Sequence, residues 1–150
     1  MKYKFITLIM VFLGTVVFQN VLAQGYQVPS RELVETLLTQ LEKCKANLAN
    51  AEKGLIEMKK NPGEYSLETY LWVENNAKEA RECITQRREE LDRLRKDYPG
   101  WFNSPTAFTD IKLKYPEIHS PRELAELLDG IELKITKVLA EWKKLPRPEH

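Results

Sequence analysis

Two stretches of this 150-residue sequence carry the same heptad pattern of apolar side chains. The seam of the first, about residues 30–60, consists of Val34, Leu37, Leu41, Cys44, Leu48, Ala51, Leu55 and Met58. The seam of the second, about residues 66–97, consists of Tyr70, Val73, Ala77, Ala80, Ile84, Arg87, Leu91 and Leu94. Spacing that alternates between three and four without a break is typical of a coiled-coil core. We therefore predict two long helices that pack along these seams.

A turn signal, Asn61-Pro62-Gly63, separates the two stretches. Folding the chain there pairs seam positions whose numbers sum to 128, so that Val34 faces Leu94. The match predicts an antiparallel hairpin, in which Ser30 caps the first helix. Arg87 is the one charged seam residue, and we expect its stem to cross the seam while its charge stays in water.

Both cysteines of the chain lie in the predicted hairpin. Cys44 is a seam residue, and Cys83 is next to Ile84, the residue predicted to face Cys44. Two cysteines allow one connectivity, and an oxidising compartment permits the bond. We therefore expect a Cys44–Cys83 disulfide; the alternatives are two buried thiols or an intermolecular bond.

Two further helices are expected after the hairpin. Ser120-Pro121-Arg122-Glu123 combines a cap, a first-turn proline and a capping-box glutamate, and it opens a third long helix at about 121–144. A short helix is expected at about 105–113. The third helix should complete an all-α three-helix bundle, with Trp142 filling space beside Ala51 and Ala77.

Residues 1–23 have the pattern of a cleavable secretory signal peptide. Lys2 and Lys4 precede an apolar run, and Val21-Leu22-Ala23 supplies a cleavage site before Gln24. Residues 24–150 are then expected to form a single helical domain in an extracytoplasmic location, secreted or periplasmic. The alternative is that residues 5–22 are retained as a membrane anchor.

Composition gives no support for a nucleic-acid partner. The chain has 23 Lys and Arg against 22 Asp and Glu; without residues 1–23, which contain two Lys, the balance is 21 minus 22, or −1. The two histidines, His119 and His150, form no metal-binding motif, and no phosphate loop or catalytic motif occurs. We expect no enzyme activity, cofactor or metal.

Aromatic residues concentrate between the second and third long helices, in a segment of about 98–119 that we call the aromatic connector. Its aromatic side chains are Tyr98, Trp101, Phe102, Phe108 and Tyr115. They either seal the open end of the bundle or form an exposed recognition patch. Trp72 lies off the seam and is a second possible anchor. The candidate partner-binding residues are therefore Trp101, Phe102, Phe108, Tyr115 and Trp72.

These features favour an exported, non-enzymatic helical protein that binds a protein partner or acts as a scaffold. Two alternatives stay open: a membrane-tethered structural coiled coil, and an enzyme or cofactor carrier. After signal cleavage we expect no stable membrane insertion. A homodimer could form on Leu38 and Ile56, the apolar positions that the seam leaves over.

Overall fold

The computed structural model describes residues 26–115 and 117–149, and the described residues are helical with no strand among them. The expected signal peptide, its cleavage site and the alternative anchor at 5–22 lie outside the described residues. In the part of the chain that is described, no helix is long and apolar enough to cross a membrane.

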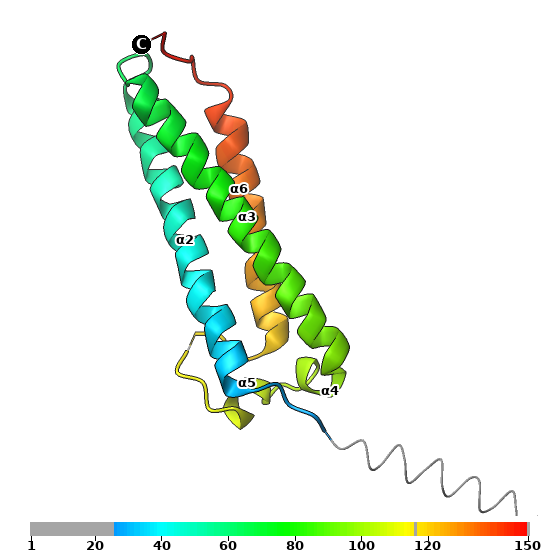
Figure 1. Cartoon of the computed structure of the whole chain (residues 1–150). Coiled ribbons are helices and arrows are strands. Elements are labelled where there is room, and N and C mark those ends of the chain that lie inside the picture. The colour runs from blue at the N-terminus through cyan, green and yellow to red at the C-terminus, as the bar shows by residue number, and fades with distance from the viewer. Residues whose placement is uncertain (1–25, 116, 150) are drawn as a thin grey trace, which may run out of the picture.

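The predicted hairpin is confirmed. Helix α2 (Arg31–Lys60) and helix α3 (Leu67–Asp97) run antiparallel and meet at a tight turn (Figure 1). Ser30 caps α2 by accepting a hydrogen bond from the Leu33 amide, and Ser66 caps α3 in the same way. Gly63 has a φ of 85° in the turn, a backbone conformation that residues other than glycine rarely adopt.

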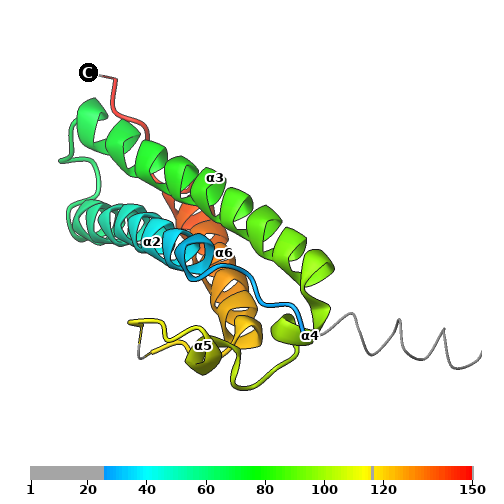
Figure 2. The ribbon, with the colours of Figure 1, turned by 60° about the horizontal axis from the view of Figure 1, so that its bottom comes forward.

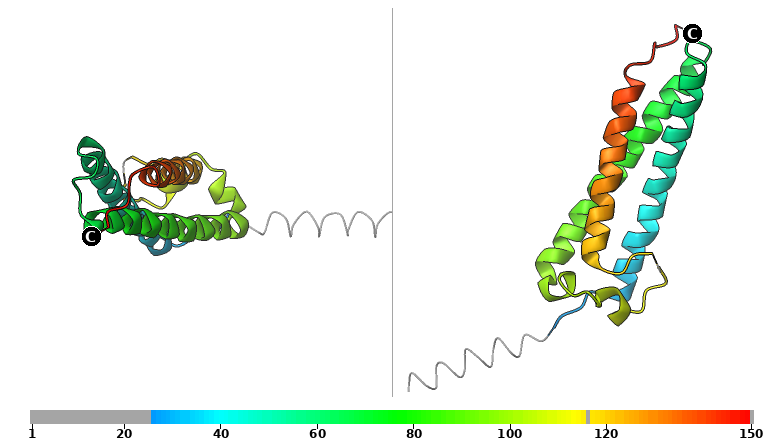
Figure 3. Two further views of the ribbon diagram at one scale, coloured as in Figure 1. Left: turned by 90° about the horizontal axis from the view of Figure 1, so that it is seen from above. Right: turned by 180° about the vertical axis from the view of Figure 1, so that it is seen from behind.

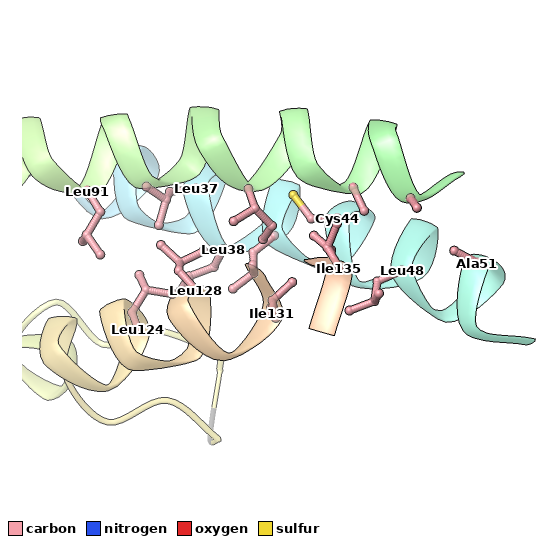
Figure 4. Packing of buried hydrophobic residues seen from close by; sticks show 14 of the residues in the cluster. Leu37, Leu38, Cys44, Leu48, Ala51, Leu91, Leu124, Leu128, Ile131 and Ile135 are labelled. Carbon is pink, nitrogen blue, oxygen red and sulfur yellow. The ribbon is translucent and has the colours of Figure 1, made fainter. Parts of the chain in front are cut away.

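Every predicted seam position of both helices is buried, from Val34 to Met58 in α2 and from Tyr70 to Leu94 in α3. Figure 4 shows seam residues such as Leu37, Cys44 and Leu91 pointing into the space between the helices. The seam therefore forms the core of the bundle, and its burial is the main hydrophobic contribution to the fold.

Helix α6 (Pro121–Trp142) is the third long helix. It runs antiparallel to α3 and packs against both hairpin helices; it lies behind them in Figure 1 and in front of them in the rear view of Figure 3. Ser120 accepts a hydrogen bond from the Glu123 amide, as the capping box predicts. Leu124, Leu128, Ile131 and Ile135 of α6 face the hairpin core (Figure 4). The predicted three-helix arrangement is confirmed.

The position of Trp142 differs from the prediction. Its ring lies 4.6 Å from the ring of Tyr70, one heptad closer to the hairpin turn than Ala77. Ala51 and Ala77 are fully buried without a contact from Trp142 in their layer. The hairpin is tightly packed nearby, since an added Cβ on Gly54 would lie 2.5 Å from Val73 Cγ2.

The aromatic connector crosses the open end of the bundle (Figure 2). It contains two single-turn helices, α4 (Pro99–Phe102) and α5 (Ala107–Asp110), instead of one helix at 105–113. Pro99 opens α4, because proline is tolerated in a first helical turn. Soon after α5, Lys112 adopts a left-handed φ of 51°, which prevents the helix from continuing to residue 113.

Candidate partner-binding surface

One face of the hairpin is left uncovered by α6. Arg81 and Arg88 extend from one flank of the α3 seam to α6, where Arg81 donates to Thr136 and Arg88 pairs with Asp129. The opposite flank of each seam therefore faces away from α6. We call this surface the open face; it comprises Leu33, Gln40, Lys43, Asn47 and Gly54 of α2, and Trp72, Asn76, Glu79, Glu82, Cys83, Gln86, Arg87 and Glu90 of α3.

Trp72 is the large apolar side chain nearest the turn end of the open face, and 42% of its surface is exposed. Its ring lies over Gly54, where an added Cβ would come within 2.9 Å of Trp72 Cζ3. The absence of a side chain at Gly54 thus lets the indole lie against the α2 backbone. An indole that packs against a helix in the free protein needs little further ordering to bind a partner.

Polar side chains link the two helices next to Trp72. The side-chain amide of Asn50 donates to Asn76 Oδ1 at 3.3 Å, and that of Asn76 donates to the Trp72 carbonyl at 2.9 Å. One turn closer to the N-terminus of α2, the side-chain amide of Asn47 donates to Glu79 Oε2 at 3.5 Å. These contacts connect α2 to α3 on the exposed side and fix the backbone that carries Trp72.

A shallow polar groove of about 560 Å³ continues from these contacts along the open face. Its walls combine amides with charges of both signs: Gln40, Lys43, Asn47, Glu79, Glu82, Cys83, Gln86 and Arg87. Two cations and two carboxylates leave no excess charge. Such a lining suits hydrogen bonds to peptide groups and mixed-charge side chains better than it suits a polyanion.

Arg87 departs from the prediction that its charge stays in water. The residue is only 7% exposed, and its guanidinium Nη2 donates to Glu90 Oε1 at 2.9 Å. Arg87 Nε is buried and has no hydrogen-bond partner in the described structure. The seam closes around the arginine stem, so the charge is neutralised by Glu90 rather than by solvent.

The predicted disulfide is confirmed: Cys44 and Cys83 are bonded, with their Cα atoms 5.5 Å apart. The bond joins α2 to α3 near the middle of the hairpin. Cys44 lies in the core, whereas Cys83 is only partly buried and lines the groove. A disulfide of this kind is typical of proteins from oxidising, extracytoplasmic compartments.

The candidate binding residues of the aromatic connector lie mostly inside the molecule. Trp101 has no exposed surface, and Phe102 and Phe108 are 6% and 4% exposed. Trp101 packs against Phe108 with 5.9 Å between ring centroids. Tyr115 is half-buried, and its hydroxyl lies 3.0 Å from the Thr39 hydroxyl of α2. This arrangement corresponds to a cap on the bundle rather than to an exposed patch.

The residues expected to support a homodimer are not brought together. Leu38 is fully buried and points toward α6 (Figure 4), whereas Ile56 is 54% exposed. The hairpin pattern alone leaves Leu38 over, because it does not show which flank the third helix covers. The predicted dimer surface is therefore wrong for Leu38, which is buried within the bundle.

Two features of the open face had no clear signal in the sequence. Gly54 resembled any isolated glycine in a helix, although its position seven residues after Asn47 and fourteen after Gln40 places it on the same stripe. The asparagine contacts depend on the helix register at side-chain level. The asparagine contacts become apparent only when α2 and α3 are placed side by side in the correct register.

Among residues 26–115 and 117–149, no group of three or more His, Cys, Asp and Glu side chains is placed to hold a metal ion. No protein-family model, curated protein or solved structure matches this chain.

Proposed function

We propose that this chain is an exported, non-enzymatic helical module that binds a protein partner through the open face, with Trp72 as its apolar anchor. The observation that carries the proposal is the exposure of Trp72 over Gly54, beside a groove lined by amides and balanced charges. Partly exposed tryptophans on rigid elements are frequent energetic centres of protein interfaces.

The choice of a protein partner follows from the chemistry of the groove. Side-chain amides at Gln40, Asn47 and Gln86 can donate to and accept from peptide groups. The balanced charge gives no attraction for a phosphate backbone or an anionic membrane. Leu133 is more exposed than Trp72, at 72%, but it lies on α6, away from the groove of the open face.

Export is part of the proposal and has its own test. The disulfide supports an oxidising destination. Expression of the full chain in its native host, followed by N-terminal sequencing of the extracytoplasmic protein, should give Gln24 as the first residue. Retention of residues 1–23 on a membrane-bound protein would instead support the anchored alternative.

Binding is tested by affinity capture with matched variants. The chain with a C-terminal tag should retain a discrete partner from the extracytoplasmic fraction, and Trp72→Ala should lose it. Leu133→Ala is the matched control, because it removes a more exposed apolar side chain from the outer surface of α6. Equal capture by the parent and both variants would contradict a role for the open face. Circular dichroism should show the same helix content for all three proteins.

A further inference from the structure

The two sulfurs of the Cys44–Cys83 bond differ in their access to solvent. Cys44 has no exposed surface and is enclosed by the core of α2, α3 and α6. Cys83 is only partly buried and forms part of the groove wall on the open face. The disulfide therefore presents one of its two ends to the surroundings.

We propose that Cys83 is a site of thiol exchange, at which an external thiolate forms a mixed disulfide while Cys44 is the leaving group. Exchange requires a thiolate to reach one sulfur and displace the other along the line of the bond. An approach to Cys44 would have to pass through the packed seam. The groove gives an approach to Cys83 alone.

The atoms balance without a separate oxidant. The thiolate R–S⁻ bonds to Cys83 Sγ, the bond between the two cysteine sulfurs breaks, and its electron pair remains on Cys44 Sγ, which then takes a proton from water. The new thiol has an acceptor already in place, because the main-chain carbonyl of Gln40 lies 3.3 Å from Cys44 Sγ. A buried thiolate is unfavourable, so protonation of Cys44 Sγ helps to complete the step. The resulting thiol can donate to the Gln40 carbonyl.

The groove can admit a thiol that carries charge. Lys43 attracts the approaching thiolate, whereas Glu79 and Glu82 oppose it; the charge of Arg87 is already paired with Glu90. The charges of the groove lining are compatible with a peptide thiol and with a cysteine on a protein. Both sources share the same chemistry at Cys83.

The site is tested by mapping the adduct on the folded, oxidised chain. The protein is incubated with reduced glutathione, free thiols are blocked with N-ethylmaleimide, and the peptides are identified by mass spectrometry. Glutathione should be found on Cys83 in at least about tenfold excess over Cys44 because access limits the reaction. The same reaction in urea is the control, and there both cysteines should carry the adduct. Equal or greater modification of Cys44 in the folded chain would overturn the proposal, as would the absence of any adduct.

A second measurement separates access from the chemistry of the bond. In Cys44→Ala the remaining Cys83 thiol should react with a chromogenic aromatic disulfide at least about ten times faster than the Cys44 thiol of Cys83→Ala. Equal rates in two variants of equal helix content would contradict the assignment. A thioredoxin-type protein whose resolving cysteine is replaced by serine then distinguishes the sources. Its trapping on Cys83 shows that a protein thiol fits the groove, and modification by glutathione alone restricts the site to small thiols.

Discussion

The indole Nε1 of Trp142 donates a hydrogen bond to the main-chain carbonyl of Tyr70 at 3.0 Å, and the two rings lie 4.6 Å apart. This contact fixes the last turn of α6 to the first turn of α3. It therefore sets the axial position of the third helix along the hairpin.

Replacement of Trp142 by Ala should lower the free energy of unfolding by roughly 3–5 kcal/mol, because a buried indole is lost and a cavity is left. Trp142→Phe retains the ring contact but removes the hydrogen bond to the Tyr70 carbonyl. Its free energy of unfolding should therefore fall by only about 1 kcal/mol. Urea denaturation followed by circular dichroism measures both. The half-exposed Trp72 is the control, and Trp72→Ala should cost clearly less than Trp142→Ala. An equal cost for the two alanine variants would contradict the described packing.

Gly54 and Gly130 provide a matched pair of helix glycines. An added Cβ on Gly54 would lie 2.5 Å from Val73 Cγ2, and Val73 is fully buried, whereas no atom of the described residues lies within 4 Å of an added Cβ on Gly130. Gly130→Ala should therefore stabilise the chain by up to about 1 kcal/mol through helix propensity. Gly54→Ala should destabilise it by about 1–3 kcal/mol, because overpacking outweighs the same propensity gain.

Thermal denaturation of the two single variants checks the signs. Gly54→Ala combined with Val73→Ala supplies a rescue, since removal of the valine methyl groups gives the new Cβ room. The double variant should be more stable than the sum of the two single changes predicts. Stabilisation by Gly54→Ala alone would show that α2 and α3 do not approach closely at this point.

Most of the hairpin could be predicted because its pattern is local. The spacing of Val34, Leu37 and their successors identifies the buried stripe, and the turn residues fix which positions face each other. Helix starts were equally clear, since Ser30, Ser66 and Ser120 all act as caps. The disulfide followed from the register, because Cys44 and Cys83 fall within one residue of a facing pair.

The position of the third helix could not be read from the sequence in the same way. A seam tells which residues of α6 are buried but not how far the helix slides along the hairpin. That distance is set by the fit of Trp142 to Tyr70. The hairpin pattern also does not show which flank α6 covers, so the sequence does not indicate that Leu38 is buried. The burial of Trp101 and Phe108 in the cap depends on tertiary contacts that the sequence does not show either.

The capping box at the start of α6 makes stability depend on pH. The Glu123 carboxylate accepts a hydrogen bond from the main-chain amide of His119 at 2.8 Å, and this bond, with a smaller contribution from the His119 side chain, holds the pKa of Glu123 below its usual value of 4.5. A lowered folded pKa adds stability that is present above the unfolded pKa and is lost as the pH falls through the folded value.

Glu123→Gln should therefore be less stable than the parent at pH 7, and the difference should shrink as the pH falls below 4.5. Melting temperatures measured between pH 7 and pH 2 would show this convergence. Glu126→Gln, which changes an exposed glutamate of α6 outside the cap, is the control and should follow the parent curve. A constant difference between Glu123→Gln and the parent across the range would rule out the cap as its origin.

Arg87 is expected to respond unusually to substitution. Its stem fills a seam position, but among the described residues its Nε is buried without a hydrogen-bond partner, and its charge is paired with Glu90. Arg87→Met keeps the stem and removes the buried charge, so the free energy of unfolding should stay constant or rise by about 1 kcal/mol. Urea denaturation provides the measurement. A fall of more than about 2 kcal/mol in the free energy of unfolding would contradict this expectation. It would mean that the attraction between Arg87 and Glu90 exceeds the cost of desolvating the two charges.

The proposed role of the open face is tested most directly by crosslinking at Trp72 itself. A photoreactive phenylalanine analogue is introduced at residue 72 in one variant and at residue 133 in another, and each is irradiated in the native host. The account predicts a discrete crosslinked protein from position 72 that is absent from position 133. A crosslink to a second copy of the chain would identify the partner as the protein itself. Identical products from both positions, or none from position 72, would contradict the assignment of the open face as the binding surface.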